Sequence, residues 1–183
     1  MIADLSGIDR WCADHLDTPP ESVVVTVAGT GATIASVLRQ IPAPALELGT
    51  SGAALLDGHG LSRAVQAALG DREVDLVIDD GSHDLQASRT VFEVLFPRLR
   101  EGGRHVLLDW AWSHRPGAPD EQPALTNLVV EIVMLAGTDP QLVRRLTVEE
   151  PAVVTERGER EVHGPFHLAG AYRNRGIRYR PVL

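Results

Sequence analysis

Apolar residues follow two different periods along the chain, and the alternation of these periods predicts alternating helices and strands. Helical spacing, with an apolar residue at every third or fourth position, recurs over residues 5–16, 33–41, 62–69, 84–101 and 125–135. Short strand candidates occupy 22–27, 45–48, 53–56, 74–78, 105–108 and 146–155, and the run at 22–27 is rich in β-branched residues. This order predicts an α/β fold with a doubly wound, mostly parallel sheet and helices on both faces.

Proline and glycine residues divide these elements. Pro19 and Pro20 should stop the first helix. Pro97 should kink or tighten the last turns of the helix that begins near Asp84, and Gly102-Gly103 should end that helix. Pro151 falls inside the last strand candidate, which predicts a bulge or an edge position there.

The most informative polar residues directly follow two of the predicted strands. The strand 74–78 runs into Asp79, Asp80 and, three residues later, His83, while the strand 105–108 ends in Asp109. The helix between the two strands suits a right-handed crossover, so the strands should be neighbours and their carboxyl ends should share one edge. Asp80 and Asp109 are therefore predicted to hold Mg²⁺ or a similar hard cation. Asp79 and Asp84 are interpreted as caps of the following helix instead.

Two histidines and a glycine loop complete the candidate chemistry. His83 lies close enough to the carboxylates to accept a proton from a metal-bound hydroxyl, and His59 is a weaker candidate for lining the pocket. Gly29 and Gly31 lie between a strand and a helix, where a ligand can approach the backbone closely. A tight strand-to-helix turn would explain the same two glycines.

Composition narrows the class of protein. The chain has 183 residues and a formal net charge of −8, which argues against nonspecific binding to nucleic acid or to anionic membranes. It has no lysine, which excludes Schiff-base chemistry and a P-loop lysine, and its single cysteine, Cys12, excludes an intramolecular disulfide. No signal peptide and no membrane span is recognised, so we expect a cytoplasmic protein.

We expect a single domain, with an N-terminal helix over 1–20, a core over 22–160 and a basic tail over 161–183. The tail interleaves arginine with aromatic residues from Tyr172 to Arg180, a pattern that can bind nucleic acid. A solvated terminal strand or a disordered end is the favoured interpretation.

One part of the chain resembles a known family. The segments are Asp75–His83 with its Asp-Asp-Gly-Ser-His string, Phe92–Pro97, Leu99–Gly103 and Val106–Asp109. Together they resemble the metal-dependent class I S-adenosylmethionine sugar O-methyltransferases of antibiotic pathways, of the macrocin and mycinamicin type, with the related cephalosporin hydroxylase-like group. The resemblance implies a compact version of the Rossmann-like class I methyltransferase fold.

The resemblance also implies roles for individual residues. Asp80 and Asp109 would be the metal ligands and His83 the base, Gly29 and Gly31 would meet the methionine end of the cofactor, and Glu47 would bind its ribose. We assign Asp57, which follows the strand candidate 53–56, to the cofactor site as well. A competing alignment places the glycine motif at 47–52 instead, and it leaves few residues before Asp79 for the usual strands.

The function expected from these residues is Mg²⁺-assisted, S-adenosylmethionine-dependent O-methylation of a sugar or another polyhydroxylated natural product. The partners would be a small hydroxylated acceptor and a second copy of the chain, with no nucleic acid and no membrane. A non-catalytic partner subunit is the alternative, suggested by the short glycine motif and by Trp110, where related enzymes often carry an acid or amide. An enzyme that uses the same pocket for a different reaction is a further alternative.

Overall fold

The computed structural model describes residues 5–16, 18–28, 45–49, 57–80, 83–118 and 124–173. Within them lies a six-stranded sheet with the strand order β2-β1-β3-β4-β6-β5. The strands are β1 (Val24–Ala28), β2 (Ala45–Gly49), β3 (Val74–Asp80), β4 (Leu99–Leu108), β5 (Val143–Val148) and β6 (Ala152–Arg157). β2, β1, β3 and β4 pair in parallel, whereas β6 and β5 are antiparallel to their neighbours. The predicted α/β class with a mostly parallel sheet is confirmed.

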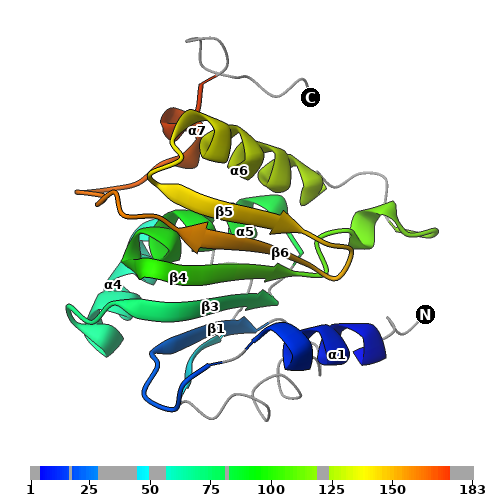
Figure 1. Cartoon of the computed structure of the whole chain (residues 1–183), viewed down its shortest axis with the longest axis horizontal. Helices are drawn as coiled ribbons and strands as arrows, with labels where there is room; N and C mark the ends of the chain where they lie inside the picture. Colours follow the sequence, from blue (N-terminus) through cyan, green and yellow to red (C-terminus); the bar gives the residue numbers. More distant parts are fainter. Residues whose placement is uncertain are drawn as a thin grey trace.

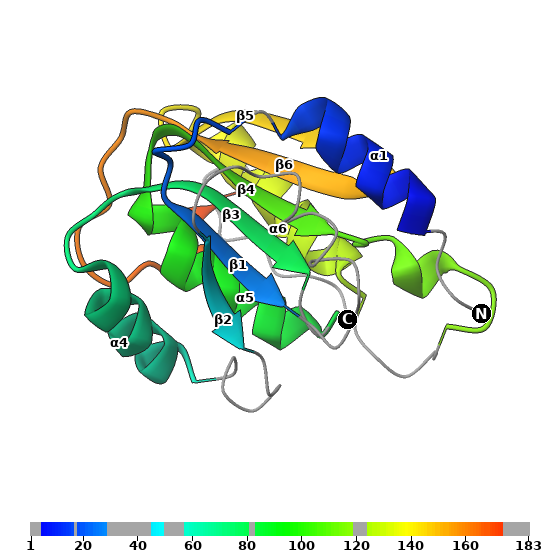
Figure 2. The ribbon, with the colours of Figure 1, turned by 90° about the horizontal axis from the view of Figure 1, so that it is seen from below.

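Helices cover both faces of this sheet, as the alternating pattern predicts. They are α1 (Leu5–His15), α4 (Gly58–Leu69), α5 (Leu85–Leu95), α6 (Thr126–Thr138) and the short α7 (Leu168–Ala171). Figure 2 shows α1 across one face, whereas α4, α5 and α6 lie on the other. The helix and the strand expected at 33–41 and 53–56, together with Gly29 and Gly31, lie outside the described residues.

Side-chain alternation in the strands produces two separate apolar cores. Val25, Val77 and Leu107 pack against α4, α5 and α6 on one face. Leu76 and Ile78 point to the other face and pack against α1. Both faces of β3 are therefore covered, which accounts for its nearly continuous apolar sequence.

The end of α5 and the start of β4 differ from the sequence prediction. Pro97 does tighten the chain, because α5 ends at Leu95 and a 3₁₀ turn, Phe96–Arg98, follows. The prediction that Gly102-Gly103 end the helix is wrong, since both glycines lie inside β4, which begins at Leu99. Gly102 has a φ of +73°, and a Cβ on Gly103 would lie 3.0 Å from the Val74 carbonyl oxygen. The glycines thus permit the register shift between β3 and β4.

The strand candidate over 146–155 is also corrected. It is an antiparallel pair, β5 and β6, and Pro151 lies in the connecting turn rather than at a bulge. The turn is closed by hydrogen bonds from the Glu149 amide to the Ala152 carbonyl and from the Ala152 amide to the Glu149 carbonyl. Proline suits this position because a turn does not need its missing N–H group.

The C-terminal segment is docked on the helices as far as the structure describes it (Figure 1). Tyr172 is fully buried, and its hydroxyl donates a hydrogen bond to Glu131 Oε1 at 3.1 Å. The prediction of a solvated or disordered end is therefore wrong for this residue. Within the described ranges, no helix is both long and apolar enough to cross a membrane.

Candidate active site

The carboxyl ends of β3 and β4 place Asp80 and Asp109 at one edge of the sheet. The two strands are parallel neighbours, and their last paired positions are Asp79 and Leu107. Asp80 is the final residue of β3, and Asp109 directly follows β4, so the predicted juxtaposition is confirmed. Asp79 lies inside the strand and is buried, so its predicted capping role is wrong, whereas Asp84 caps α5 through the Ala87 amide at 2.9 Å.

The surroundings of Asp80 oppose the ionisation of its carboxyl group. Asp80 is 6% exposed and Asp109 8%. Burial, together with the negative charge of Asp109, raises the pKa of Asp80 from 3.8 to about 6. A cation between the two groups would relieve both effects, so the pair is an energetically favourable place for positive charge.

His83 lies beside these carboxylates, as the sequence predicts. Its Nε2 is 3.9 Å from Asp109 Oδ2, which is too long for a hydrogen bond. Burial lowers the pKa of His83, the charge of Asp109 opposes this change, and the positive charge of Arg115 adds to it. The imidazole is therefore held in its neutral, proton-accepting form near pH 7.

The backbone is strained at two of these site residues. His83 and Asp109 have φ angles of +56° and +52°, a region that residues with a side chain seldom adopt. Among the described residues other than glycine, they are the two with positive φ. Strain of this kind concentrates at functional sites, where the surrounding structure holds a side chain in place.

Arg115 is a site residue that the sequence prediction missed. Its Nη2 lies 2.6 Å from Asp109 Oδ1 and 3.3 Å from Glu150 Oε1. The turn after β4, which contains the 3₁₀ segment Trp112–His114, carries Arg115 back to Asp109. An irregular turn has no periodic signal in sequence, and the only available hint was a basic residue in the least regular part of the chain.

The residues of the site provide donors suited to a hard divalent cation. Mg²⁺ commonly takes one or two carboxylates and completes its octahedral shell with water and substrate oxygens. Asp80 and Asp109 supply such carboxylates in a setting that favours positive charge. The described residues contain no cluster of three or more histidine, cysteine or acidic side chains that could hold a metal ion.

The predicted cofactor residues are less completely described. Glu47 lies on β2, with an exposed side chain, and β1 separates that strand from β3. Asp57 caps α4, where its Oδ1 accepts a hydrogen bond from the His59 amide at 3.1 Å. Their roles toward a cofactor stay predictions.

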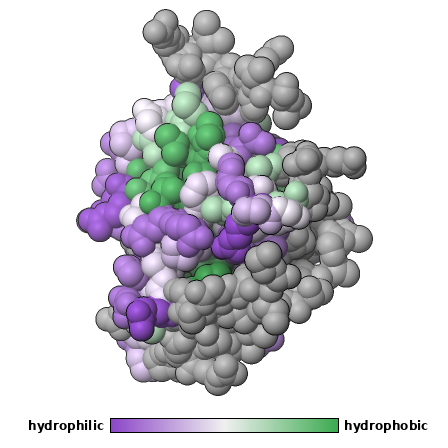
Figure 3. Space-filling model, turned by 90° about the vertical axis from the view of Figure 1, so that its right-hand side faces the viewer, coloured by the Kyte–Doolittle hydropathy of each residue, from purple (hydrophilic) through white to green (hydrophobic). Residues whose placement is uncertain are grey.

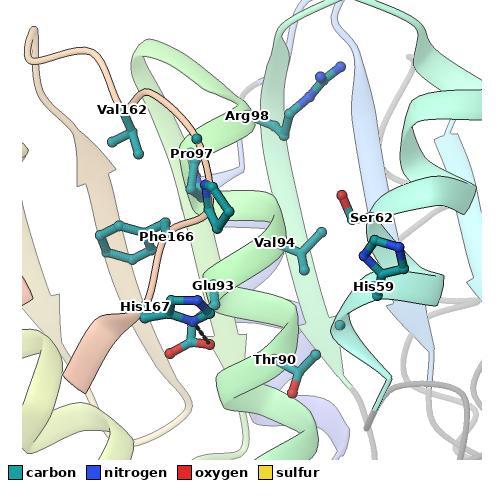
Figure 4. A pocket seen from close by; sticks show the side chains of 13 residues that line it. His59, Ser62, Thr90, Glu93, Val94, Pro97, Arg98, Val162, Phe166 and His167 are labelled. Atoms are coloured by element: carbon teal, nitrogen blue, oxygen red, sulfur yellow. Dashed lines mark ion pairs between the residues drawn. The ribbon is translucent and has the colours of Figure 1, made fainter. Parts of the chain in front are cut away.

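His59 lines a cavity whose lining does not include His83, Asp80 or Asp109. This cavity, of about 840 Å³, lies between α4, α5 and the segment before α7. Figure 4 shows His59 and Ser62 on one side of it and Phe166 and His167 on the other. It lies along the outer side of α5, so the structure does not bring His59 together with the carboxylates.

Figure 3 views the molecule from the side to which the parallel strands run, where hydrophilic and hydrophobic side chains lie next to one another. No family model matches the chain.

Short segments of curated sugar O-methyltransferases are similar to the chain. The chain is 51% identical over 43 residues to L-olivosyl-oleandolide 3-O-methyltransferase of Streptomyces antibioticus, a match that covers 24% of this chain and 11% of that protein. It is 44% identical over 55 residues to demethylmacrocin O-methyltransferase of Streptomyces fradiae, covering 30% and 14%. It is 49% identical over 43 residues to mycinamicin VI 2''-O-methyltransferase of Micromonospora griseorubida, covering 24% and 11%. These matches confirm the resemblance to the macrocin and mycinamicin group.

Solved methyltransferase structures share the fold. The mycinamycin-pathway methyltransferase MycE, in a complex with Mg, SAH and mycinamycin VI, matches with a TM-score of 0.59 and 21% identity over 84% of this chain. The chain spans about half of MycE, since the match covers 48% of it. A putative ribosomal RNA methyltransferase from Plasmodium falciparum matches with a TM-score of 0.51 and 11% identity, covering 94% of this chain and 99% of that one. The predicted Rossmann-like class I methyltransferase fold is confirmed.

Proposed function

We propose that the chain is an S-adenosylmethionine-dependent, divalent-cation-assisted O-methyltransferase that acts on a hydroxyl group of a sugar or another polyhydroxylated natural product. The observation that carries the proposal is the placement of Asp80, Asp109 and His83 at the ends of adjacent parallel strands. The local identity to sugar O-methyltransferases and the similarity to MycE, whose structure contains Mg and SAH, support the same reaction.

The chain's own residues would have distinct tasks in this reaction. Asp80 and Asp109 would hold the divalent cation, and Gly29, Gly31, Glu47 and Asp57 would hold S-adenosylmethionine. When bound, the cofactor supplies an electrophilic methyl group and the cation polarises the acceptor hydroxyl. His83, neutral near pH 7, would accept the hydroxyl proton at an imidazole nitrogen.

Orientation would supply much of the rate acceleration. Transfer of a methyl group needs the acceptor oxygen and the methyl carbon to be held in line. The strained backbone at His83 and Asp109 fixes two of the site's side chains relative to each other. The Trp112 ring, tilted at 5.8 Å from the His83 ring, limits the movement of the imidazole further.

The first test is binding. We expect calorimetry to detect the binding of S-adenosylmethionine to the protein. Electron paramagnetic resonance should detect the binding of Mn²⁺, a spectroscopic substitute for Mg²⁺. Asp80→Asn and Asp109→Asn should each weaken Mn²⁺ binding by tenfold or more, because each removes a charged ligand. Asp71→Asn, at an exposed carboxylate between α4 and β3, is the control and should leave binding unchanged. Absence of cofactor binding, with and without the cation, would refute the proposal.

The second test is turnover, measured as S-adenosylhomocysteine formed with mycinamicin VI or demethylmacrocin as acceptor probes. His83→Gln should lower kcat by roughly 10² to 10⁴-fold and leave cofactor binding intact, because it removes a base without removing charge. An undiminished rate between pH 6 and pH 8 would remove His83 from the mechanism.

A further inference from the structure

Arg115 forms an ion pair with one carboxylate oxygen of Asp109, a proposed ligand of the divalent cation. Arg115 Nη2 lies 2.6 Å from Asp109 Oδ1, and the carboxylate is almost fully buried. The guanidinium is 39% exposed and the side chain of Glu150 is 73% exposed. A single nitrogen of Arg115 therefore lies between a buried carboxylate at the site and a solvated one outside it.

We propose that Arg115 is a resident substitute for the divalent cation. It neutralises Asp109 while the cation is absent and moves to Glu150 when the cation binds. The inference rests on the proposed function, because it requires a divalent cation at Asp80 and Asp109.

Electrostatic repulsion disfavours the simultaneous presence of the two cations at Asp109. A guanidinium at 2.6 Å from Oδ1 would lie within a few ångströms of an ion held by the same carboxylate. Like charges at that separation repel each other even when water screens them partly. Without either cation, Asp109 would keep a negative charge at a buried position, where no ion pair would compensate it.

The structure allows Arg115 to move without disrupting its surroundings. Its backbone is held by a hydrogen bond from its own amide to the Trp112 carbonyl at 3.1 Å, and the Trp112 amide donates to the Asp109 carbonyl at 3.1 Å. Because Nη2 is already 3.3 Å from Glu150 Oε1, a change in side-chain rotamers suffices for the transfer. Glu150 lies in the β5–β6 turn, next to Glu149, whose carbonyl accepts a hydrogen bond from the Trp110 indole at 2.7 Å.

The first measurement is Mn²⁺ affinity by electron paramagnetic resonance, in the absence of S-adenosylmethionine. Arg115→Gln should bind Mn²⁺ roughly tenfold more tightly than the wild type, because the ion no longer displaces a guanidinium. Arg144→Gln is the matched control: it removes an exposed arginine that pairs with Glu156 on β6 and should leave the affinity unchanged. Thermal unfolding of each variant verifies that the fold is intact.

A double-mutant cycle tests whether Arg115 moves from Asp109 to Glu150 when the cation binds, or only repels the cation from a fixed position. Glu150→Gln should weaken Mn²⁺ binding several-fold in the wild type, because Arg115 loses its second partner, and should have little effect in the Arg115→Gln background. Equal weakening in both backgrounds would make Glu150 a direct contributor to the ion site and would overturn the proposal.

The two proposals fail in different ways. Equal Mn²⁺ affinity in the wild type and in Arg115→Gln would overturn the inference that Arg115 takes the place of the cation. The proposed metal site would be unaffected by that result. Absence of Mn²⁺ binding in the wild type and in Arg115→Gln overturns both the metal part of the proposed function and the inference.

Discussion

Asp80 shows how a proposed metal ligand lowers the stability of the fold that carries it. Its carboxyl group is buried beside Asp109, and its pKa is raised to about 6. Below pH 3.8 the group is protonated in both the folded and the unfolded chain, so it does not lower the free energy of unfolding. As the pH rises from 3.8 to about 6, the unfolded chain ionises first and the folded state loses stability. Above pH 6 the loss is constant at about 3 kcal/mol.

Asp80→Asn should therefore stabilise the metal-free protein near pH 7.5, by up to about 3 kcal/mol, and by much less at pH 4. The check is urea unfolding at both pH values in the presence of a chelator, with Asp71→Asn as the exposed control. A stability difference that does not depend on pH would contradict the raised pKa. Together with loss of Mn²⁺ binding, the gain would show that Asp80 is retained for function rather than for folding.

The proximity of Asp80 and Asp109 could be predicted from sequence, and the position of Arg115 could not. The first depends on a regular rule, since a strand, a helix and a second parallel strand bring two carboxyl ends to one edge. The second depends on an irregular turn and on the positive φ of Asp109. Neither of these leaves a repeating pattern of apolar residues.

Elements were predictable where one face of a helix or strand is buried, and the errors fall where the chain turns. The apolar run of β3 and the helical period of α5 identified both elements. The strand β4 was predicted too short because Gly102-Gly103 resemble a helix end, whereas here they allow a strand to change register. Pro151 was misread because β5 and β6 are joined by a short turn, so that the two strands were taken as one.

Gly158 has a specific packing role where the end of β6 meets the start of β5. Its amide donates to the Leu142 carbonyl at 2.8 Å, and a Cβ at this position would collide with the Gln141 carbonyl group. Gly158→Ala should destabilise the protein by about 2 kcal/mol or more, because backbone atoms must move to admit the methyl group.

Gly137→Ala is the matched control for this effect. Gly137 lies in α6, and a Cβ there would meet no atom within 4 Å, so alanine should stabilise the protein by up to about 1 kcal/mol. Denaturant unfolding of both variants gives the comparison. Equal effects of the two substitutions would show that loss of glycine flexibility, and not a collision, governs Gly158.

Three distant parts of the chain meet in one buried polar network, which joins α5, α6 and the segment after α7. Arg89 on α5 forms an ion pair with Glu131 on α6 at 2.7 Å, and Tyr172 near the C-terminal end of the described chain donates to the other oxygen of Glu131 at 3.1 Å. Glu131 is 2% exposed, so each of its carboxylate oxygens has a partner inside the protein. The network thus links the helix between β3 and β4 to the antiparallel part of the molecule.

This network predicts an unequal response to removal of its members. Glu131→Ala should lower the free energy of unfolding by about 3–5 kcal/mol, because it leaves the Arg89 guanidinium without its anion. The Arg89 side chain is only 20% exposed. Tyr172→Phe should cost only about 1–2 kcal/mol, because Glu131 keeps its ion pair and loses one hydrogen bond. Arg144→Ala, which breaks an exposed ion pair on β5, should cost less than about 0.5 kcal/mol. Denaturant unfolding measures all three, and a loss for Glu131→Ala no larger than that for Arg144→Ala would show that the C-terminal segment is held by apolar packing alone.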